Sequence, residues 1–554
     1  MAEPRRESPK TAPINPITKK GDKGFVADHI DQHRSKDLVF AITGYIGSGM
    51  SQVADHLRDL LKQEHSITAV VVKCSDLLAA EAAREGQPTT ETPIERTKQL
   101  QQFGNGLREK HGSAVIAGLV IRRIKQYRAE HPADERLAFV IDCCKHPAEV
   151  EALRNVYGRG FFLVASICDY ETRKSWLRTK FGVESKDDEI EQVMDADLAE
   201  PDDWGQQVRK TIPLADYFAN RNAEASNSLE RQLKRLLHLV LGVGVDRPGR
   251  DERGMYAAWG AAMRSACLSR QVGAAILNPQ GIVIATGTND VPAPGGGLYP
   301  KTEESSGEDA RCFLSTDDPD GKKLAERQRS NIWKRVLPVI APSDGLKPFC
   351  RNDETKKAIW EAVSLQLNEI LATEGQTKVF TAKKVKDALE GTPIKDLVEF
   401  SRALHAEADA LLSLARAGGP SCDGASLYVN VFPCHLCTRQ IIAAGIKEVV
   451  YIEPYPKSMA MILHDDAIAD PEQSERLKTD EAGTGKVRFR LFCGVAPRRY
   501  VDLFEKHPDI KKDGVLGQGP KRPLDPFFRK SHLDFESSIA AEVDQVVPDP
   551  HTKE

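Results

Sequence analysis

The feature that most constrains the fold of this chain is an alternation of apolar strands and amphipathic helices. The strand segment DLVFAITG (37–44) precedes a helical pattern over Ser51–Gln63, and RLAFVIDCC (136–144) is a later strand segment. Strands that alternate with helices form parallel, doubly wound sheets with helices on both faces. The sequence therefore predicts an α/β domain over residues 37–242. A linker rich in Gly, Pro and charge follows over 243–254.

The alternation restarts after the linker, which predicts a second α/β domain over residues 255–505. Its first strands are the pair VGAAILNPQGIVIATG (272–287), with Pro-Gln-Gly at the turn. Residues 291–400 form a long insertion without a strong pattern, and such insertions are usually functional or mobile. Few large apolar residues and many charges predict a disordered arm over 1–36 and a tail over 506–554.

Composition excludes several classes of function. The 554 residues carry 77 Lys+Arg against 81 Asp+Glu, a net charge of -4, which argues against duplex DNA as the main ligand. No apolar run reaches about 18 residues and the N-terminus has no apolar signal segment, so we expect a cytoplasmic protein without a membrane partner. Eleven cysteines are too few for a disulfide scaffold, and we expect reduced thiols.

The strongest functional signal is HAE at 405–407 together with PCHLC at 433–437. This is the H-x-E…P-C-x-x-C arrangement of zinc-dependent nucleobase deaminases. His405, Cys434 and Cys437 supply three ligands and leave the fourth position of a tetrahedral zinc open, as a catalytic zinc requires. Glu407 is close enough to exchange a proton with a metal-bound water without ligating the metal, so it is the predicted catalytic acid/base.

The alternative interpretation of these residues is a structural zinc site or plain core packing. A structural site normally has four protein ligands, and the sequence holds no second C-x-x-C. Two competing functions stay open: a polynucleotide deaminase acting on tRNA or single-stranded DNA, and a non-catalytic nucleotide- or RNA-binding sensor. The first needs a basic channel with interleaved aromatic residues, and only 6% of residues are aromatic. The intact Glu407 argues against the second.

Residues from about 255 to 505 resemble the deoxycytidylate deaminase family. Besides the zinc motif, SRQVGAAI (269–276), GIVIATGTND (281–290) and EPYPKSMAMILHDDAI (453–468) carry the resemblance. It implies an α/β/α sandwich of the cytidine deaminase type, a zinc-dependent hydrolase, one zinc ion per domain and a homo-oligomer.

The same resemblance implies substrate contacts. Asn289 is expected to hydrogen-bond the sugar 3′-hydroxyl, and a plain turn residue is the alternative at that position. Weaker candidates for base stacking or phosphate contact are Tyr455, Lys457 and Arg498 or Arg499.

The first strand of the chain runs into GYIGSGMS (44–51), which has the context and glycines of a phosphate-binding loop, G-x-x-x-x-G-K-[ST]. Met50 occupies the lysine position, so phosphoryl transfer should be weak or absent. The glycines and the helix N-terminal amides still suit phosphate, and a hydroxyl and a carboxylate are in place for Mg²⁺. The predicted nucleotide contacts are Gly44, Gly47, Gly49, Ser51 and Asp142.

The N-terminal domain resembles deoxynucleoside monophosphate kinases in QQFGNGLREKHG (101–112) and VIDCCKHPAEV (140–150). We expect a kinase-like fold that binds a regulatory nucleotide or a small RNA, with a structural relic as the alternative. Such a domain followed by a deoxycytidylate-deaminase-like domain resembles the antiviral dCTP deaminases, over roughly residues 37–505. That resemblance implies conversion of dCTP or dCMP to dUTP or dUMP plus ammonia, which depletes dCTP in anti-phage defence.

Overall fold

The fold is described from a computed structural model of the chain. The described residues are 37–87, 92–131, 136–168, 170–182, 187–198, 203–221, 228–299, 351–373, 379–389, 401–455, 458–469, 485–505, 511–512, 515–516 and 529–547. The predicted arm over 1–36 lies outside them, as do residues 301–350 of the predicted insertion. Among the helices of these ranges, none combines the length and the apolar character needed to cross a membrane.

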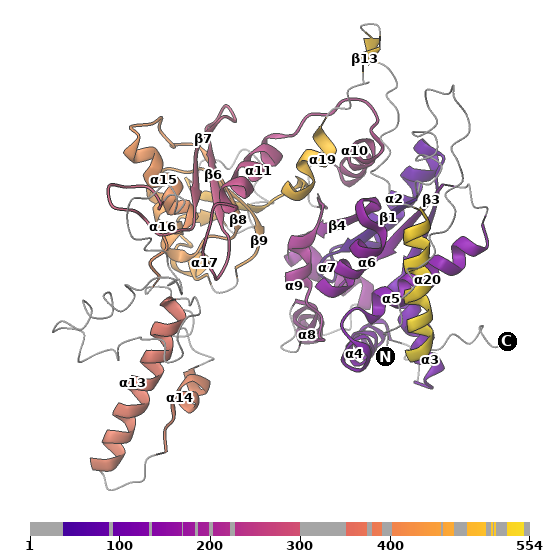
Figure 1. The fold of residues 1–554 in the computed structure, drawn as a ribbon, viewed down its shortest axis with the longest axis horizontal. Helices are drawn as coiled ribbons and strands as arrows, with labels where there is room; N and C mark the ends of the chain where they lie inside the picture. The colour runs from indigo at the N-terminus through magenta and orange to yellow at the C-terminus, as the bar shows by residue number, and fades with distance from the viewer. Residues whose placement is uncertain are drawn as a thin grey trace, which may run out of the picture.

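A six-stranded sheet organises the N-terminal half (Figure 1), with strand order β12-β5-β4-β1-β3-β2. Neighbours among β1 to β5 are parallel, and β12 is antiparallel to β5. The strands are β1 (Leu38–Thr43), β2 (Thr68–Lys73), β3 (Leu137–Asp142), β4 (Phe161–Ile167), β5 (Tyr217–Asn220) and β12 (Gly494–Val495). The predicted doubly wound parallel sheet is thereby confirmed.

Helices cover both faces of this sheet because its strands are apolar on both sides. Leu38, Phe40 and Ile42 of β1 pack into one buried cluster with α2 and α10, whereas Val39 and Ala41 pack into another with α4, α5 and α6. Two-sided burial is the reason that these strands appear as continuous apolar runs. The main helices are α2 (Met50–His65), α3 (Cys74–Arg84), α4 (Pro93–His111), α5 (Val115–Ala129), α6 (Pro147–Tyr157), α7 (Tyr170–Phe181), α8 (Asp187–Leu198) and α10 (Leu229–Leu241).

A second six-stranded sheet, of order β10-β11-β9-β8-β6-β7, organises the C-terminal half. β6 is antiparallel to β7 and β8, and the other neighbours are parallel. Its strands are β6 (Gly273–Leu277), β7 (Val283–Thr288), β8 (Ser426–Val431), β9 (Glu448–Glu453), β10 (Ile468–Ala469) and β11 (Val487–Leu491). The helices of this half include α11 (Arg250–Ala262), α13 (Arg351–Thr373), α14 (Ala382–Leu389), α15 (Ala406–Arg416), α16 (His435–Ala443), α17 (Ala460–Leu463) and α19 (Tyr500–Phe504).

Two glycines let helices press directly onto opposite faces of this sheet. A Cβ on Gly273 would lie 2.0 Å from the Ala258 carbonyl oxygen in α11. A Cβ on Gly287 would lie 2.1 Å from the Ala406 carbonyl oxygen in α15. Since Gly287 is paired with Ala274, the neighbour of Gly273, the two helices lie on opposite faces. This arrangement confirms the expected α/β/α sandwich and fixes the start of α15, where the metal motif lies.

The end of the chain returns to the N-terminal half, and here the predicted tail over 506–554 needs correction. Residues Arg529–Val546 form α20, which packs along α5 (Figure 1). Arg122 of α5 donates to Asp544, and Arg128 pairs with the fully buried Glu536. Two of the charges that make this segment look like a tail are therefore ion-paired, and its apolar residues complete the core on that face. The two-residue strand β12 likewise completes the sheet edge beside β5.

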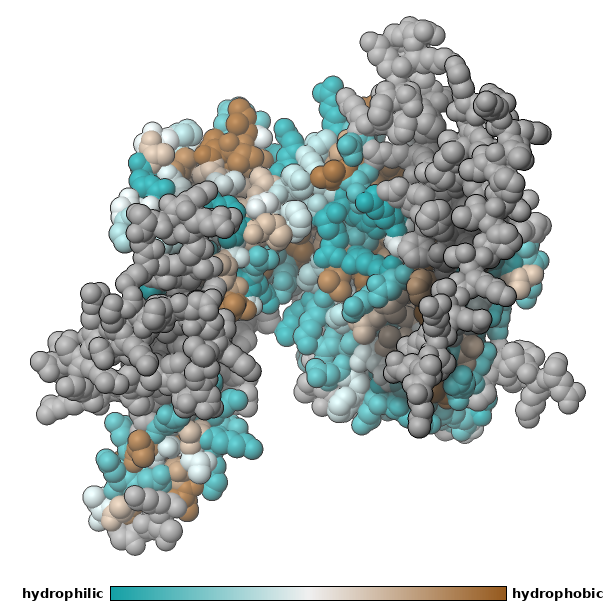
Figure 2. Space-filling model, in the orientation of Figure 1, coloured by the Kyte–Doolittle hydropathy of each residue, from teal (hydrophilic) through white to brown (hydrophobic). Residues whose placement is uncertain are grey.

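The turn before β7 exposes apolar side chains. Ile282 is 61% exposed and Val283 is 41% exposed. Figure 2 shows apolar surface in the region that Figure 1 labels β7. β7 is also an edge strand of its sheet, so this side of the molecule combines unpaired backbone with apolar side chains.

Candidate metal centre and active site

The candidate metal ligands lie where two helices begin. His405 is the residue before α15 and Cys434 is the residue before α16, with Cys437 in the first turn of α16. Leu404, the residue before His405, forms an antiparallel backbone bridge with Asp290, which lies two residues after the end of β7. This bridge holds His405 beside the end of β7. Strand β8 and the following Pro433 lead to Cys434. Both helix N-termini therefore point toward the same place, and their dipoles favour thiolates there.

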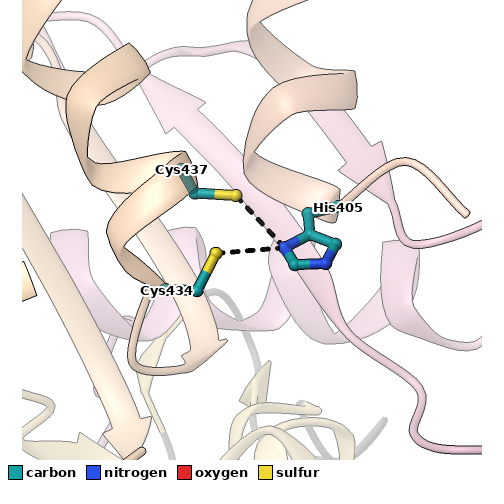
Figure 3. Close-up of side chains that lie close together, drawn as sticks. All are labelled: His405, Cys434 and Cys437. Atoms are coloured by element: carbon teal, nitrogen blue, oxygen red, sulfur yellow. Dashed lines mark hydrogen bonds between the residues drawn. The ribbon is translucent and has the colours of Figure 1, made fainter. Parts of the chain in front are cut away.

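The three side chains converge as a metal site requires (Figure 3). His405 Nδ1 lies 3.3 Å from Cys434 Sγ and 3.3 Å from Cys437 Sγ. Both cysteines are buried, and all three donor atoms lie within 4.8 Å of one another. In a tetrahedral zinc site, Zn–S and Zn–N bonds place nitrogen and sulfur about 3.5 Å apart. The spacing and the S₂N donor set fit zinc, and no fourth protein ligand belongs to this cluster among the described residues.

The electrostatics of the cluster favour thiolate and imidazole partners. A hydrogen bond with Cys437, and then His405, lower the pKa of Cys434 to about 4. The hydrogen bond with Cys434 raises the pKa of His405 to about 9. Cys437 shares the same proton network, and its pKa is raised, first by the contact with Cys434 and then by burial. His405, Cys434 and Cys437 therefore share protons through hydrogen bonds, and a bound metal cation would displace those protons.

Glu407 lies within this cluster rather than on the surface. It is in the first turn of α15, is 4% exposed, and its carboxyl group contacts the Cys437 thiol. Burial raises the pKa of Glu407. The arrangement brings together all four residues of the predicted motif, with the carboxyl group beside the donor set.

Asn289 lies at the end of the β7 segment and braces the neighbouring loop. Its Oδ1 accepts the Val272 N–H at 2.7 Å, and its Nδ2 donates to the Arg270 carbonyl oxygen at 2.7 Å. Arg270 in turn pairs with Glu453 at 2.9 Å, at the end of β9. Each amide atom of Asn289 keeps further hydrogen-bonding capacity. Its contact with a sugar stays a prediction.

The remaining substrate candidates divide into two groups. Tyr455 is next to the metal loop, because Ser458 donates to both the Tyr455 and the Pro433 carbonyl oxygens. Lys457 lies outside the described residues. Arg499 pairs with Asp216 and donates to the Phe161 carbonyl oxygen, so it binds the N-terminal sheet, whereas a substrate contact of Arg498 stays a prediction. The sequence alone could not show this, because the short segment that carries Arg499 packs against the N-terminal sheet rather than beside the metal ligands.

The phosphate-loop residues are also gathered in one place. Gly47 and Gly49 have φ of 84° and 77°, the left-handed backbone that glycine adopts readily. Ser51 Oγ donates to Asp142 Oδ2 at 2.8 Å, as expected for a hydroxyl and a carboxylate that share a cation site. The side chains of Lys145 and Asp197, which are not among the predicted contacts, also reach the loop. The only sequence signal for Lys145 is its position three residues after the strand end at Asp142, and Asp197 has none.

One family match covers the C-terminal site. Residues 248–453 match the family described as the cytidine and deoxycytidylate deaminase zinc-binding region. The deoxycytidylate deaminase of Enterobacteria phage T4 is 46% identical over 55 residues, 10% of this chain and 28% of that protein. The solved dCMP deaminase of cyanophage S-TIM5 in complex with dCMP and dUMP has 18% sequence identity and a TM-score of 0.21, covering 44% of this chain and 98% of its own.

The chain also matches a curated protein that is not described as a deaminase. A UPF0200/UPF0201 protein of Archaeoglobus fulgidus is 29% identical over 209 residues, 38% of this chain and 58% of the archaeal protein. The chain thus spans less than two thirds of each of these two curated relatives. What the matches show is a C-terminal domain of the cytidine and deoxycytidylate deaminase type, with its zinc-binding region.

Proposed function

We propose that this protein hydrolytically deaminates deoxycytidine nucleotides, dCMP or dCTP, to the uracil nucleotide and ammonia. The observation that carries the proposal is the position of Glu407, buried against the S₂N donor set of His405, Cys434 and Cys437. A structural zinc site has no use for a buried carboxyl group beside its ligands, whereas a hydrolytic deaminase does. The match to the deaminase family over 248–453 supports the same chemistry.

The three donors would hold zinc, which when bound acts as a Lewis acid and makes water acidic near neutral pH. Glu407 carries the protons: its carboxylate accepts one from the attacking water and delivers it to N3 of the pyrimidine ring. A second transfer through the same carboxyl group places a proton on the leaving amino nitrogen. The C4–O bond forms and the C4–N bond breaks, one water is consumed and one ammonia leaves. Burial suits Glu407 to this role, because a raised pKa lets it both take and return a proton.

The test is to incubate the purified, zinc-loaded protein with dCMP, dCTP, CMP and cytosine-containing oligonucleotides, and to measure uracil products by chromatography. Free deoxynucleotides are the expected substrates. Turnover of oligonucleotides alone would replace this proposal with the polynucleotide deaminase. Glu407→Gln should abolish turnover while zinc content stays at one per chain. Glu369→Gln, the same change on the exposed face of α13, is the matched control and should keep full activity.

For the N-terminal half we propose that the loop over 44–51 binds a regulatory nucleotide together with Mg²⁺. The pairing of Ser51 with Asp142 and the left-handed glycines support this role. We also propose a cytoplasmic, antiviral enzyme that acts as a homo-oligomer, with the exposed edge at β7 as the contact between copies. Light scattering can test this by comparing the molar mass of the wild type with that of an Ile282→Lys variant. The wild type should have the mass of an oligomer, whereas the charge at this edge should leave the variant monomeric.

A further inference from the structure

The phosphate loop already holds an anion that belongs to the protein itself. The Ile46 N–H donates to Asp197 Oδ2 at 2.7 Å. Asp197 is in the last turn of α8, 151 residues away in sequence, and its side chain is only 1% exposed. Backbone N–H groups of such loops and of the helix that follows are the groups that bind phosphate oxygens. The buried carboxylate of Asp197 therefore accepts a hydrogen bond from a backbone N–H group that a phosphate oxygen would otherwise accept.

A lysine from the turn after β3 supplies the cation that the loop lacks. Lys145 Nζ lies 2.6 Å from Asp197 Oδ1 and donates to the Gly44 carbonyl oxygen at 2.9 Å. Its position follows from the turn after β3, where Cys143 has a φ of 108°. Burial lowers the pKa of Lys145, but the carboxylate of Asp197 outweighs it and the pKa is raised, so the ammonium group stays charged. Met50 instead packs against the apolar cluster under the loop.

Two further features point to a phosphate-bearing ligand. Ser48 Oγ is buried, has no hydrogen-bond partner among the described residues, and lies over Gly44 at the base of the loop. Arg173 and Arg221 also reach the loop: Arg173 lies over the Tyr45 ring at 5.0 Å, and Arg221 donates to the Gly47 carbonyl oxygen. An unused buried hydroxyl and three cationic groups around one glycine-rich loop form a surplus of donors over the carboxylates of Asp197 and Asp142.

We propose that Asp197 is an internal competitor at a phosphate-binding site in which Lys145 replaces the missing loop lysine. The phosphate chain of a nucleotide displaces the Asp197 carboxylate from the Ile46 N–H and takes over the ion pair with Lys145. This inference rests on the proposed regulatory nucleotide site and is independent of the deaminase chemistry. It explains how a loop without its own lysine can bind phosphate and yet release it readily, because the protein supplies the substitute anion.

The experiment is isothermal titration of the zinc-loaded full-length protein with inorganic tripolyphosphate and with ATP, each with and without Mg²⁺. Asp197→Asn should bind both probes at least tenfold more tightly than wild type, because the competitor is neutral. Lys145→Met should bind at least tenfold more weakly. Ser51→Ala should abolish the effect of Mg²⁺ on affinity. Glu191→Gln is the matched control: it removes a carboxylate from the same helix, where it pairs with Lys174 away from the loop, and should leave affinity unchanged.

Removing one member of a buried ion pair can unfold a protein, so a double variant is included. Lys145→Met/Asp197→Asn leaves no unpaired charge, should keep the wild-type melting profile, and should bind as weakly as Lys145→Met. The proposal is overturned if Asp197→Asn binds no more tightly than wild type. It is equally overturned if the double variant binds as tightly as Asp197→Asn. Tripolyphosphate is not a deaminase substrate, so a missing deaminase activity in the same preparations would refute the proposed reaction and leave this result intact.

Discussion

A buried carboxylate at the start of β9 gives a sharp test of how charge holds the C-terminal half together. Glu448 accepts hydrogen bonds from Arg488 and from both Nε and Nη2 of Arg490. Arg490 continues the network to Asp251 of α11, so it ties the sheet to the helix beside the linker. Burial raises the pKa of Glu448, but the guanidinium groups of Arg490 and Arg488 outweigh it and lower the pKa from 4.5 to about 2.

The change to make is Glu448→Gln, which keeps the shape and removes the charge. A pKa lowered from 4.5 to about 2 corresponds to about 3 kcal/mol of stability. Because the folded-state pKa is depressed, this stability is fully present above pH 4.5 and is lost as the pH falls toward 2. At pH 7 the variant should therefore melt roughly 6–12 °C below wild type, at about 2–4 °C per kcal/mol for a domain of this size.

The assay is thermal unfolding at several values of pH between 7 and 3, comparing the variant with wild type at each. Both proteins release zinc alike on acidification, so their difference isolates Glu448. At pH 3 the difference should shrink to less than half of its neutral value. A deficit that stays constant down to pH 3 would show that the glutamine disturbs packing, and no deficit at pH 7 would refute the charge argument altogether. Glu369→Gln should show neither effect.

Three further predictions follow from features of the sheets and their ends. Cys434→Ser should reduce bound zinc, measured by mass spectrometry of the metal, to well below one per chain, because only two of the described donors remain. Gly287→Ala should cost at least about 2 kcal/mol in urea denaturation, since its Cβ meets α15 backbone, whereas Gly260→Ala, which meets nothing within 4 Å, should be neutral or stabilising by up to about 1 kcal/mol. A chain ending at residue 528 should lose hydrogen-exchange protection in α5, because α20 covers that helix.

The parts of the fold that the sequence predicts well are those decided by local patterns. β1 alternates its side chains between two buried clusters, so its apolar run is visible without any knowledge of its partners. The metal site is predicted for the same reason: His405 and the two cysteines each lie at a helix start with a recognisable local signature. Local rules were enough there because each ligand is positioned by its own element.

The parts that sequence could not predict depend on partners far along the chain. β12 is two residues long and is a strand only because β5, far earlier in the chain, offers it an open edge, where Gly494 pairs with Phe218. α20 carries so many charges that its sequence resembles a disordered tail. Its apolar face can be recognised as part of the core only once α5, on which it packs, is known. Asp197 has no motif at all, since its role depends on a loop 151 residues earlier. Long-range pairing of this kind leaves no periodic trace in a single sequence.

The return of β12 and α20 to the first sheet also has a consequence for the order in which the protein can be made. Synthesis delivers β1 to β5 first, but among the described residues the edge of β5 is covered by residues 494–495 and the outer face of α5 by residues 529–546. At about 5–20 residues per second, the first half waits on the order of half a minute for them. During that interval an unfinished strand edge is open to other chains, so this half completes its folding only after β12 and α20 have been synthesised.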